Sequence, residues 1–135
     1  MAGYLLDTNH LGIAVRTGAG VRARIQKTRS EGARFGTCIP VLCELEIGIQ
    51  QVRYSDLYRK SLARFLAHVT LWPLDLETAR IYGELSLDLR RRGRVLSQVD
   101  RMLAALALRS GLTLLTTDRD FEAVPGLRVE NWLNS

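Results

Sequence analysis

Short apolar runs alternate along the chain with longer segments in which apolar residues recur every three or four positions. The short runs are nearly continuous in apolar residues, which is typical of strands buried on both faces of a parallel sheet. They cover residues 4–7, 35–39, 69–74, 112–117 and 127–132. The pattern therefore predicts five short strands.

The segments between these runs have the period of amphipathic helices. The clearest of them cover residues 19–31, 55–68 and 76–92. Another helix is expected to begin at Pro40, because proline is favoured in a first helical turn. Ser97 and Gly111 are typical start and stop residues for one more. Alternating strands and helices predict a single α/β domain over residues 1–135.

The chain carries nineteen basic and fourteen acidic residues, a formal net charge of +5. This balance favours an acidic partner such as nucleic acid.

The sequence does not start with basic residues followed by an apolar stretch, as a signal peptide would. No apolar run reaches about 18 residues, so we expect a cytoplasmic protein with no membrane span.

The cysteines and histidines are few and scattered, which argues against a disulfide framework or a zinc site. Cys38 falls in a predicted strand and Cys43 in the helix after it, so we expect both to be packed thiols. His10 and His68 are the only histidines.

Several acidic residues follow a predicted strand or open a predicted helix. They are Asp7, Glu44, Asp100, Asp118 and Asp120. In parallel sheets, ligands bind beyond the carboxyl ends of the strands, and all five side chains can point to that edge. Because these acids share one edge of the predicted sheet, we expect them to form one acidic site.

Each acid also has a simpler interpretation. Asp7 and Asp118 can cap the helical segments that follow them, and Ser97 with Asp100, or Thr117 with Asp120, has capping-box spacing. Glu44 can be a solvated helix residue.

Two observations favour a site over simple capping. Asp100 and Glu44 lie on helix faces that should pack against the fold, where an unpaired carboxylate is costly. A shared Mg²⁺ or Mn²⁺ ion explains the convergence, because hard cations take oxygen ligands and leave positions for water and phosphate. Such an ion would activate water against a phosphodiester, while a basic surface holds RNA.

The sequence resembles PIN-domain ribonucleases of the VapC toxin type. Motifs in the family order carry the resemblance: "LLDTN" (5–9), "PVLCELEIGI" (40–49), "SQVDRMLAALAL" (97–108), "LLTTDRDF" (114–121) and "VPGLRVENW" (124–132). The resemblance implies a parallel sheet of strand order 3-2-1-4-5 and a metal-dependent endoribonuclease. It also implies a VapB-like antitoxin and a homodimer as partners.

The resemblance assigns roles residue by residue. The acidic quartet is Asp7, Glu44, Asp100 and Asp118. Asp7, Asp100 and Asp118 are implied to hold the metal, while Glu44 completes the shell or orients the attacking water. The supporting residues are Thr8, Asn9, Thr116 and Asp120. Val99 stands where the family commonly has asparagine before the aspartate, which removes any supporting role at that position.

Basic residues near the acids are candidates for RNA contact. They are Arg101 and Arg119 beside site acids, and Arg91 and Arg92 in the run "LRRRGR". That run can equally be a solvated helix end, where cations favour the helix dipole.

Three other function classes are alternatives to a ribonuclease. A non-catalytic PIN-like module that binds RNA or a partner is the main alternative, and the intact quartet argues against it. A phosphoacceptor receiver domain needs a lysine at a late strand end, but the only lysines are Lys27 and Lys60 in early helical segments. Dinucleotide binding lacks the required G-x-G-x-x-G motif.

Overall fold

The computed structural model describes residues 2–16 and 18–133, and its centre is a parallel sheet. The strands are β1 (Gly3–Leu6), β2 (Arg34–Thr37), β3 (Thr70–Leu71), β4 (Thr113–Leu115) and β5 (Arg128–Glu130). Their order in space is β3-β2-β1-β4-β5. The predicted fold class and strand order are confirmed, although β2 to β5 are shorter than their apolar runs and β1 begins and ends one residue earlier than its run.

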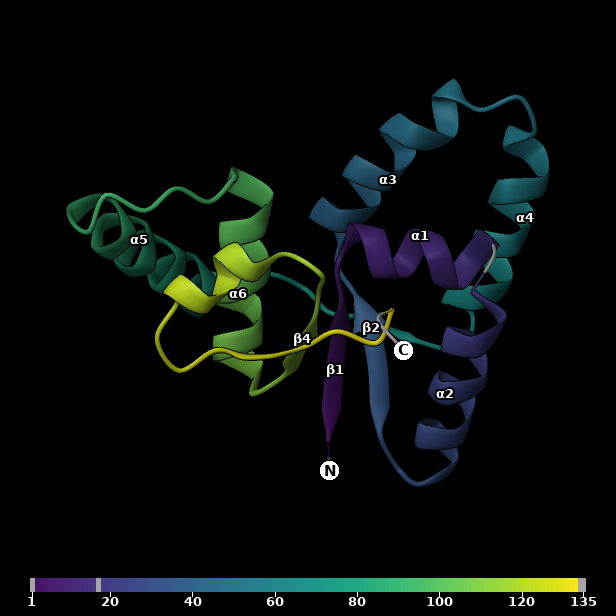
Figure 1. Cartoon of the computed structure of the whole chain (residues 1–135), viewed down its shortest axis with the longest axis horizontal. Coiled ribbons are helices and arrows are strands. Elements are labelled where there is room, and N and C mark those ends of the chain that lie inside the picture. The colour runs from purple at the N-terminus through teal and green to yellow at the C-terminus, as the bar shows by residue number, and fades with distance from the viewer. Residues whose placement is uncertain (1, 17, 134–135) are drawn as a thin grey trace.

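Helices cover both faces of this sheet. They are α1 (Thr8–Arg16), α2 (Ala19–Ser30), α3 (Ile39–Gln51), α4 (Ser55–Leu66), α5 (Leu76–Arg91), α6 (Gln98–Ser110) and the 3₁₀ helix η1 (Arg119–Ala123). In Figure 1, α1 to α4 lie together on one side of the strands, and α5 and α6 lie together on the other. Right-handed crossovers explain this division, because the chain moves outward from β1 to β3 and then returns past β1 to β4.

The helix boundaries follow the signals in the sequence. The Ser97 hydroxyl accepts a hydrogen bond from the Asp100 N–H at 3.1 Å and so caps α6. Gly111 ends α6 in the left-handed region with φ 66°, which glycine adopts without steric cost. Pro40 lies in the first turn of α3 as predicted. Local capping chemistry therefore determines where these helices start and stop.

The two central strands are buried on both faces. Leu5 and Leu6 of β1 and Leu114 and Leu115 of β4 are all fully buried, which accounts for their continuous apolar runs. At the edge, Gly36 lets β3 approach closely, since a Cβ there would lie 2.0 Å from the Thr70 carbonyl oxygen.

The expectation for the cysteines is wrong for one of them. Cys38 is fully buried, but it follows β2 as the residue before α3 instead of lying in a strand. Cys43 is exposed because it lies on the outer face of α3. Among the described residues, no helix is both long and apolar enough to cross a membrane.

Candidate active site at the carboxyl edge of the sheet

The two central strands bring Asp7 beside the segment that follows β4. Leu6 pairs with Leu115 in the parallel register, and the Asp7 N–H donates to the Leu115 carbonyl oxygen at 3.1 Å. Both strands run in the same direction, so the residues after each of them emerge at one edge. This edge is where β1 leads into α1 and where α6 begins (Figure 1).

Asp7 is buried and held by two donors from α1. Its Oδ1 atom accepts from the His10 N–H at 2.7 Å, which caps α1, and lies 3.1 Å from His10 Nδ1. The other ring nitrogen of His10, Nε2, accepts from the Trp132 N–H at 3.1 Å. Because an accepting Nε2 carries no proton, Nδ1 is the donor to Asp7 in a neutral ring. The Oδ1 atom of Asp7 is thus held in place by the backbone and the ring of His10.

His10 is a positioning residue that the sequence analysis missed. It is fully buried and reaches a backbone group 122 residues away, and this contact has no signature in the sequence. The one available signal was local: a histidine stands three residues after a candidate site acid and on the same helical face.

Glu44 reaches the site from α3. The Thr8 hydroxyl donates to Glu44 Oε1 at 2.6 Å and so joins the first residue of α1 to the second turn of α3. Glu44 is half-buried, as its helical face predicted. The hydroxyl of Thr8 therefore has a defined role, which is to orient Glu44.

The segment after β4 arranges Asp118. Its N–H donates to the buried Thr116 hydroxyl at 3.0 Å, and its Oδ1 accepts from the Asp120 N–H at 2.8 Å, which caps η1. Asn9 Nδ2 reaches the Thr117 hydroxyl at 3.4 Å and links α1 to the same segment. Asp120 itself is exposed and contributes its backbone N–H.

Asp100 completes the group from the first turn of α6. Burial raises the pKa of its carboxyl above the ordinary value, whereas a hydrogen bond with the Ser97 side chain acts in the opposite direction. The negative charges of three carboxylates raise that pKa further. They belong to Asp118, Glu44 and Asp7. The other three acids are therefore close enough to Asp100 to act on its carboxyl electrostatically.

A helix-capping role leaves Asp7 and Asp118 able to contribute to a site as well. Asp7 and Asp118 each use one carboxylate oxygen as a helix cap, and the second oxygen is available to another partner. The capping interpretation of these two residues is confirmed. The proposed capping pair of Thr117 with Asp120 is not formed; the hydroxyl of Thr116 binds this turn instead.

The donor chemistry of the site fits a hard divalent cation. All four converging side chains are carboxylates, and Mg²⁺ takes only one or two of them directly while it keeps several waters. Within residues 2–16 and 18–133, no three His, Cys, Asp or Glu side chains form a group compact enough to hold an ion. The four acids are thus spread apart and do not form a compact metal-binding cluster.

The candidate RNA-binding arginines fall into two kinds. Arg101 donates to the Ser86 hydroxyl at 3.1 Å and stacks over the ring of Tyr82, and Arg92 bonds Asp88 and the Ala123 carbonyl oxygen. Arg101 thus links α6 to α5, and Arg92 links the end of α5 to η1. Arg91 and Arg119 are exposed, and Arg119 makes a long pairing with Glu122 at 3.6 Å.

A hollow of about 490 Å³ adjoins the acids on the side of α1, α3 and α4. Thr8, Asn9 and Glu44 line its end nearest the site, and Ile13, Leu45 and Tyr58 line its apolar part. Of the four acids, Glu44 is therefore the one that this hollow reaches.

The chain matches known proteins over most of its length. The model of the PIN domain family matches residues 4–127. The tRNA(fMet)-specific endonuclease VapC of Shigella flexneri is 29% identical over 136 residues, 98% of this chain and 99% of that protein. Ribonuclease VapC5 of Mycobacterium tuberculosis is 30% identical over 95 residues, 69% of this chain and 70% of that protein.

A solved structure has the same fold. It is DNA-bound VapBC from Salmonella typhimurium, with a TM-score of 0.87 and 26% identity. The alignment covers 98% of this chain and 99% of that chain.

Proposed function

The chain belongs to the PIN domain family and, within it, to the VapC ribonucleases, and from this premise we propose that it is a divalent-metal-dependent endoribonuclease that acts at its acidic quartet. The observation that supports the proposal is that Asp7, Glu44 and Asp118, which come from three separate segments, lie near enough to Asp100 for their charges to raise its pKa. Four carboxylates so placed repel one another unless a cation neutralises them.

We assign the metal to Asp7, Asp100 and Asp118, with Mg²⁺ or Mn²⁺ as the ion. When bound, such an ion supplies a Lewis acid that polarises the phosphodiester and lowers the pKa of water. The chain provides rigidity: His10 and the N-terminus of α1 fix Asp7, and the N-terminus of η1 fixes Asp118. Preorganised ligands of this kind need little rearrangement during the reaction.

Glu44 orients the attacking water in this proposal. The bond from Thr8 occupies Oε1, and a carboxylate has a second oxygen that can accept a proton from water. As the water oxygen bonds to phosphorus, the P–O3′ bond breaks, and the leaving oxygen takes up a proton. The products carry a 5′-phosphate and a 3′-hydroxyl.

The substrate and partners follow from the relatives. One relative is named as a tRNA(fMet)-specific endonuclease, which supports transfer RNA as the first substrate to test. The structural neighbour is a VapBC complex, which supports a VapB-like antitoxin as the partner. A homodimer is proposed as well, on the resemblance alone.

One observation favours a second candidate, a non-catalytic PIN-like module that binds RNA. In the part of the chain that the structure describes, the acids do not form a compact metal-binding group. This candidate predicts RNA binding without cleavage.

Cleavage of RNA under defined metal conditions separates the two candidates. Purified protein, freed of antitoxin, is incubated with total RNA in Mg²⁺, in Mn²⁺ and in EDTA, and the fragment ends are mapped. The nuclease proposal predicts discrete fragments with 5′-phosphates in either metal and none in EDTA. Intact RNA in all three conditions, from protein shown to be folded, would favour the binding module.

A further inference from the structure

A second hollow lies at the opposite edge of the sheet from the acids. It measures about 510 Å³ and lies between the end of α2, the start of β2 and the segment after α4. A neighbouring hollow of about 370 Å³ shares Gln26 and His68 with it and extends between α2 and α4. We call the two together the α2–α4 groove, and the basic and polar residues that matter in its lining are Arg22, Gln26, Arg29, Arg34, Arg64 and His68.

The charge of this groove is of one sign. No Asp or Glu is among the residues that line either hollow. Over its twelve residues, α2 carries four cations and no acid. The ion pairs found among the described residues engage other arginines, namely Arg59, Arg80, Arg92, Arg109 and Arg119. Gathered cations without a carboxylate favour an anionic ligand.

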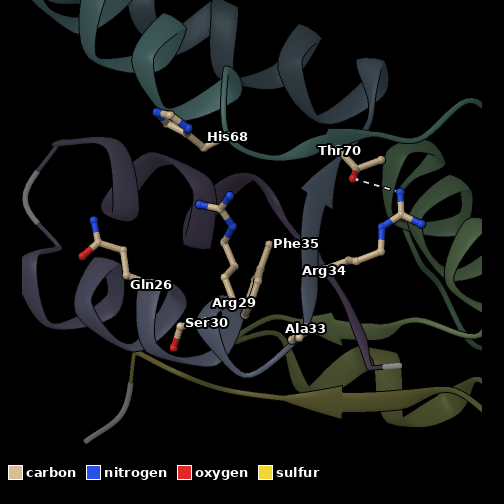
Figure 2. A pocket seen from close by; sticks show the side chains of 9 residues that line it. Gln26, Arg29, Ser30, Ala33, Arg34, Phe35, His68 and Thr70 are labelled. Atoms are coloured by element: carbon tan, nitrogen blue, oxygen red, sulfur yellow. Dashed lines mark hydrogen bonds between the residues drawn. The ribbon is translucent and has the colours of Figure 1, made fainter.

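The side chains inside the groove are positioned to meet such a ligand. In Figure 2, the guanidinium of Arg29 extends between Gln26 and Phe35 and points toward His68. The Arg34 side chain turns the other way and donates to the Thr70 hydroxyl at 3.4 Å. Arg29 is thus the cation that projects into the hollow, while Arg34 holds its rim.

The spacing of the cations favours a polyanion over one small anion. Arg22 and Arg29 are seven residues apart on α2, which corresponds to about 10 Å along the helix axis. Cations that extend over this length can contact several phosphates of one nucleic-acid backbone at the same time. Arg64 faces the same groove from α4, so cations line both of its walls, and the polar ring of His68 lies on the α4 side as well.

The groove is separate from the acidic site. Arg34, at its rim, pairs in register with Gly3 at the start of β1, whereas Asp7 follows the end of β1. The four residues of β1 span about 13 Å. An extended or structured RNA can contact both places, whereas a short oligonucleotide at the acids reaches only one.

We propose that the α2–α4 groove binds the phosphodiester backbone of structured RNA at a distance from the bond that is cut. The proposal rests on the proposed ribonuclease function, for which the groove would act as a second, sequence-independent contact. Phosphate contacts of this kind raise affinity and fix orientation without reading bases.

Direct binding tests the groove without any need for cleavage. The probes are unfractionated transfer RNA, a dinucleotide and a DNA duplex, each labelled and measured by fluorescence anisotropy in EDTA. The test variant is Arg29→Gln with Arg64→Gln. The control is Arg80→Gln with Arg109→Gln, which lowers the net charge equally but on α5 and α6. Thermal melts establish that both variants fold.

The groove predicts a loss specific to long RNA. The test variant should bind transfer RNA about tenfold more weakly than the control, with a salt dependence reduced by about two charges. The dinucleotide, which has one phosphodiester and cannot span the groove, should bind both variants equally. Equal binding of transfer RNA by the two variants would overturn the proposal, and a larger loss for duplex DNA than for RNA would assign the groove to DNA.

Cleavage kinetics separate a failure of the groove from a failure of the nuclease. If the protein cuts transfer RNA, the test variant should raise KM about tenfold and leave kcat unchanged. An unchanged KM would reject the groove and leave the nuclease intact. If no RNA is cut, the nuclease proposal fails, and the anisotropy result alone decides whether the groove binds RNA.

Discussion

The Nδ1 atom of His10 lies 3.1 Å from the Oδ1 atom of Asp7, although the His10 side chain is fully buried. The Trp132 N–H, bound to the other ring nitrogen, makes Nδ1 the donor. A candidate site carboxylate is therefore fixed through the histidine ring by the segment that follows β5. A change that displaces Trp132 in the folded protein would therefore also displace His10 and Asp7.

Replacement of His10 should weaken both stability and cleavage. In His10→Ala the Trp132 N–H loses its acceptor inside the protein and a buried ring leaves a cavity, so we expect a loss of about 2–4 kcal/mol in the free energy of unfolding. Urea unfolding measures this loss. The control is His68→Ala, because His68 is exposed and should leave the midpoint unchanged. Equal midpoints for the two variants would show that His10 contributes no stability.

Removal of the Thr8 hydroxyl should impair cleavage more than stability. Thr8→Val breaks the 2.6 Å bond to Glu44, so Glu44 loses its orientation, and we expect kcat to fall about tenfold with a stability change of about 1 kcal/mol. Thr8→Ser keeps the hydroxyl and should restore most of the activity. If the serine variant is as impaired as the valine variant, the hydroxyl is not what orients Glu44.

An added methyl group at Gly36 should destabilise the sheet. In Gly36→Ala the new Cβ meets the Thr70 carbonyl oxygen and the Trp72 ring, so β2 and β3 must separate, at a cost of about 1–3 kcal/mol. The matched change Gly83→Ala lies in α5 with open space around it, and it should stabilise by about 0.5–1 kcal/mol. Thermal melts of both variants measure the difference, and opposite signs are expected.

The two cysteines should differ in reactivity. Burial raises the pKa of the Cys38 thiol to about 11, so little thiolate exists at neutral pH and reagents cannot reach it. Cys43 is exposed on α3. A thiol reagent such as Ellman's reagent should therefore modify one cysteine in the native protein and two in urea, with Cys43→Ser abolishing the native reaction. Modification of two thiols in the folded protein would contradict the burial of Cys38.

Local signals in the sequence were enough to predict the strands and most of the helices. Ser97, Pro40 and Gly111 act within one helical turn, so their effects are readable from neighbours. The expected order of the strands came from the resemblance. The capping roles of Asp7 and Asp118 were also local and were foreseen as alternatives.

Contacts that depend on the packed fold were not predictable in this way. The bond between His10 and Trp132 joins the two ends of the chain, and the bond between Thr8 and Glu44 requires α1 and α3 to meet. Cys43 was misassigned because helical period alone did not identify the outer face of α3. The α2–α4 groove likewise depends on two helices that are distant in sequence.

Cleavage of transfer RNA by Asp7→Asn, compared with wild type and with Asp88→Asn, tests most directly whether the acidic quartet is a catalytic centre. Asparagine at position 7 can still accept the bonds from His10, so the fold should persist, but it lacks the charge that a metal requires. Asp88 is an exposed acid on α5 away from the quartet, and its loss should have little effect. We predict that Asp7→Asn, folded by thermal melt, produces no metal-dependent fragments while Asp88→Asn cuts like wild type. Undiminished cleavage by folded Asp7→Asn would contradict the assignment of the quartet as the active site.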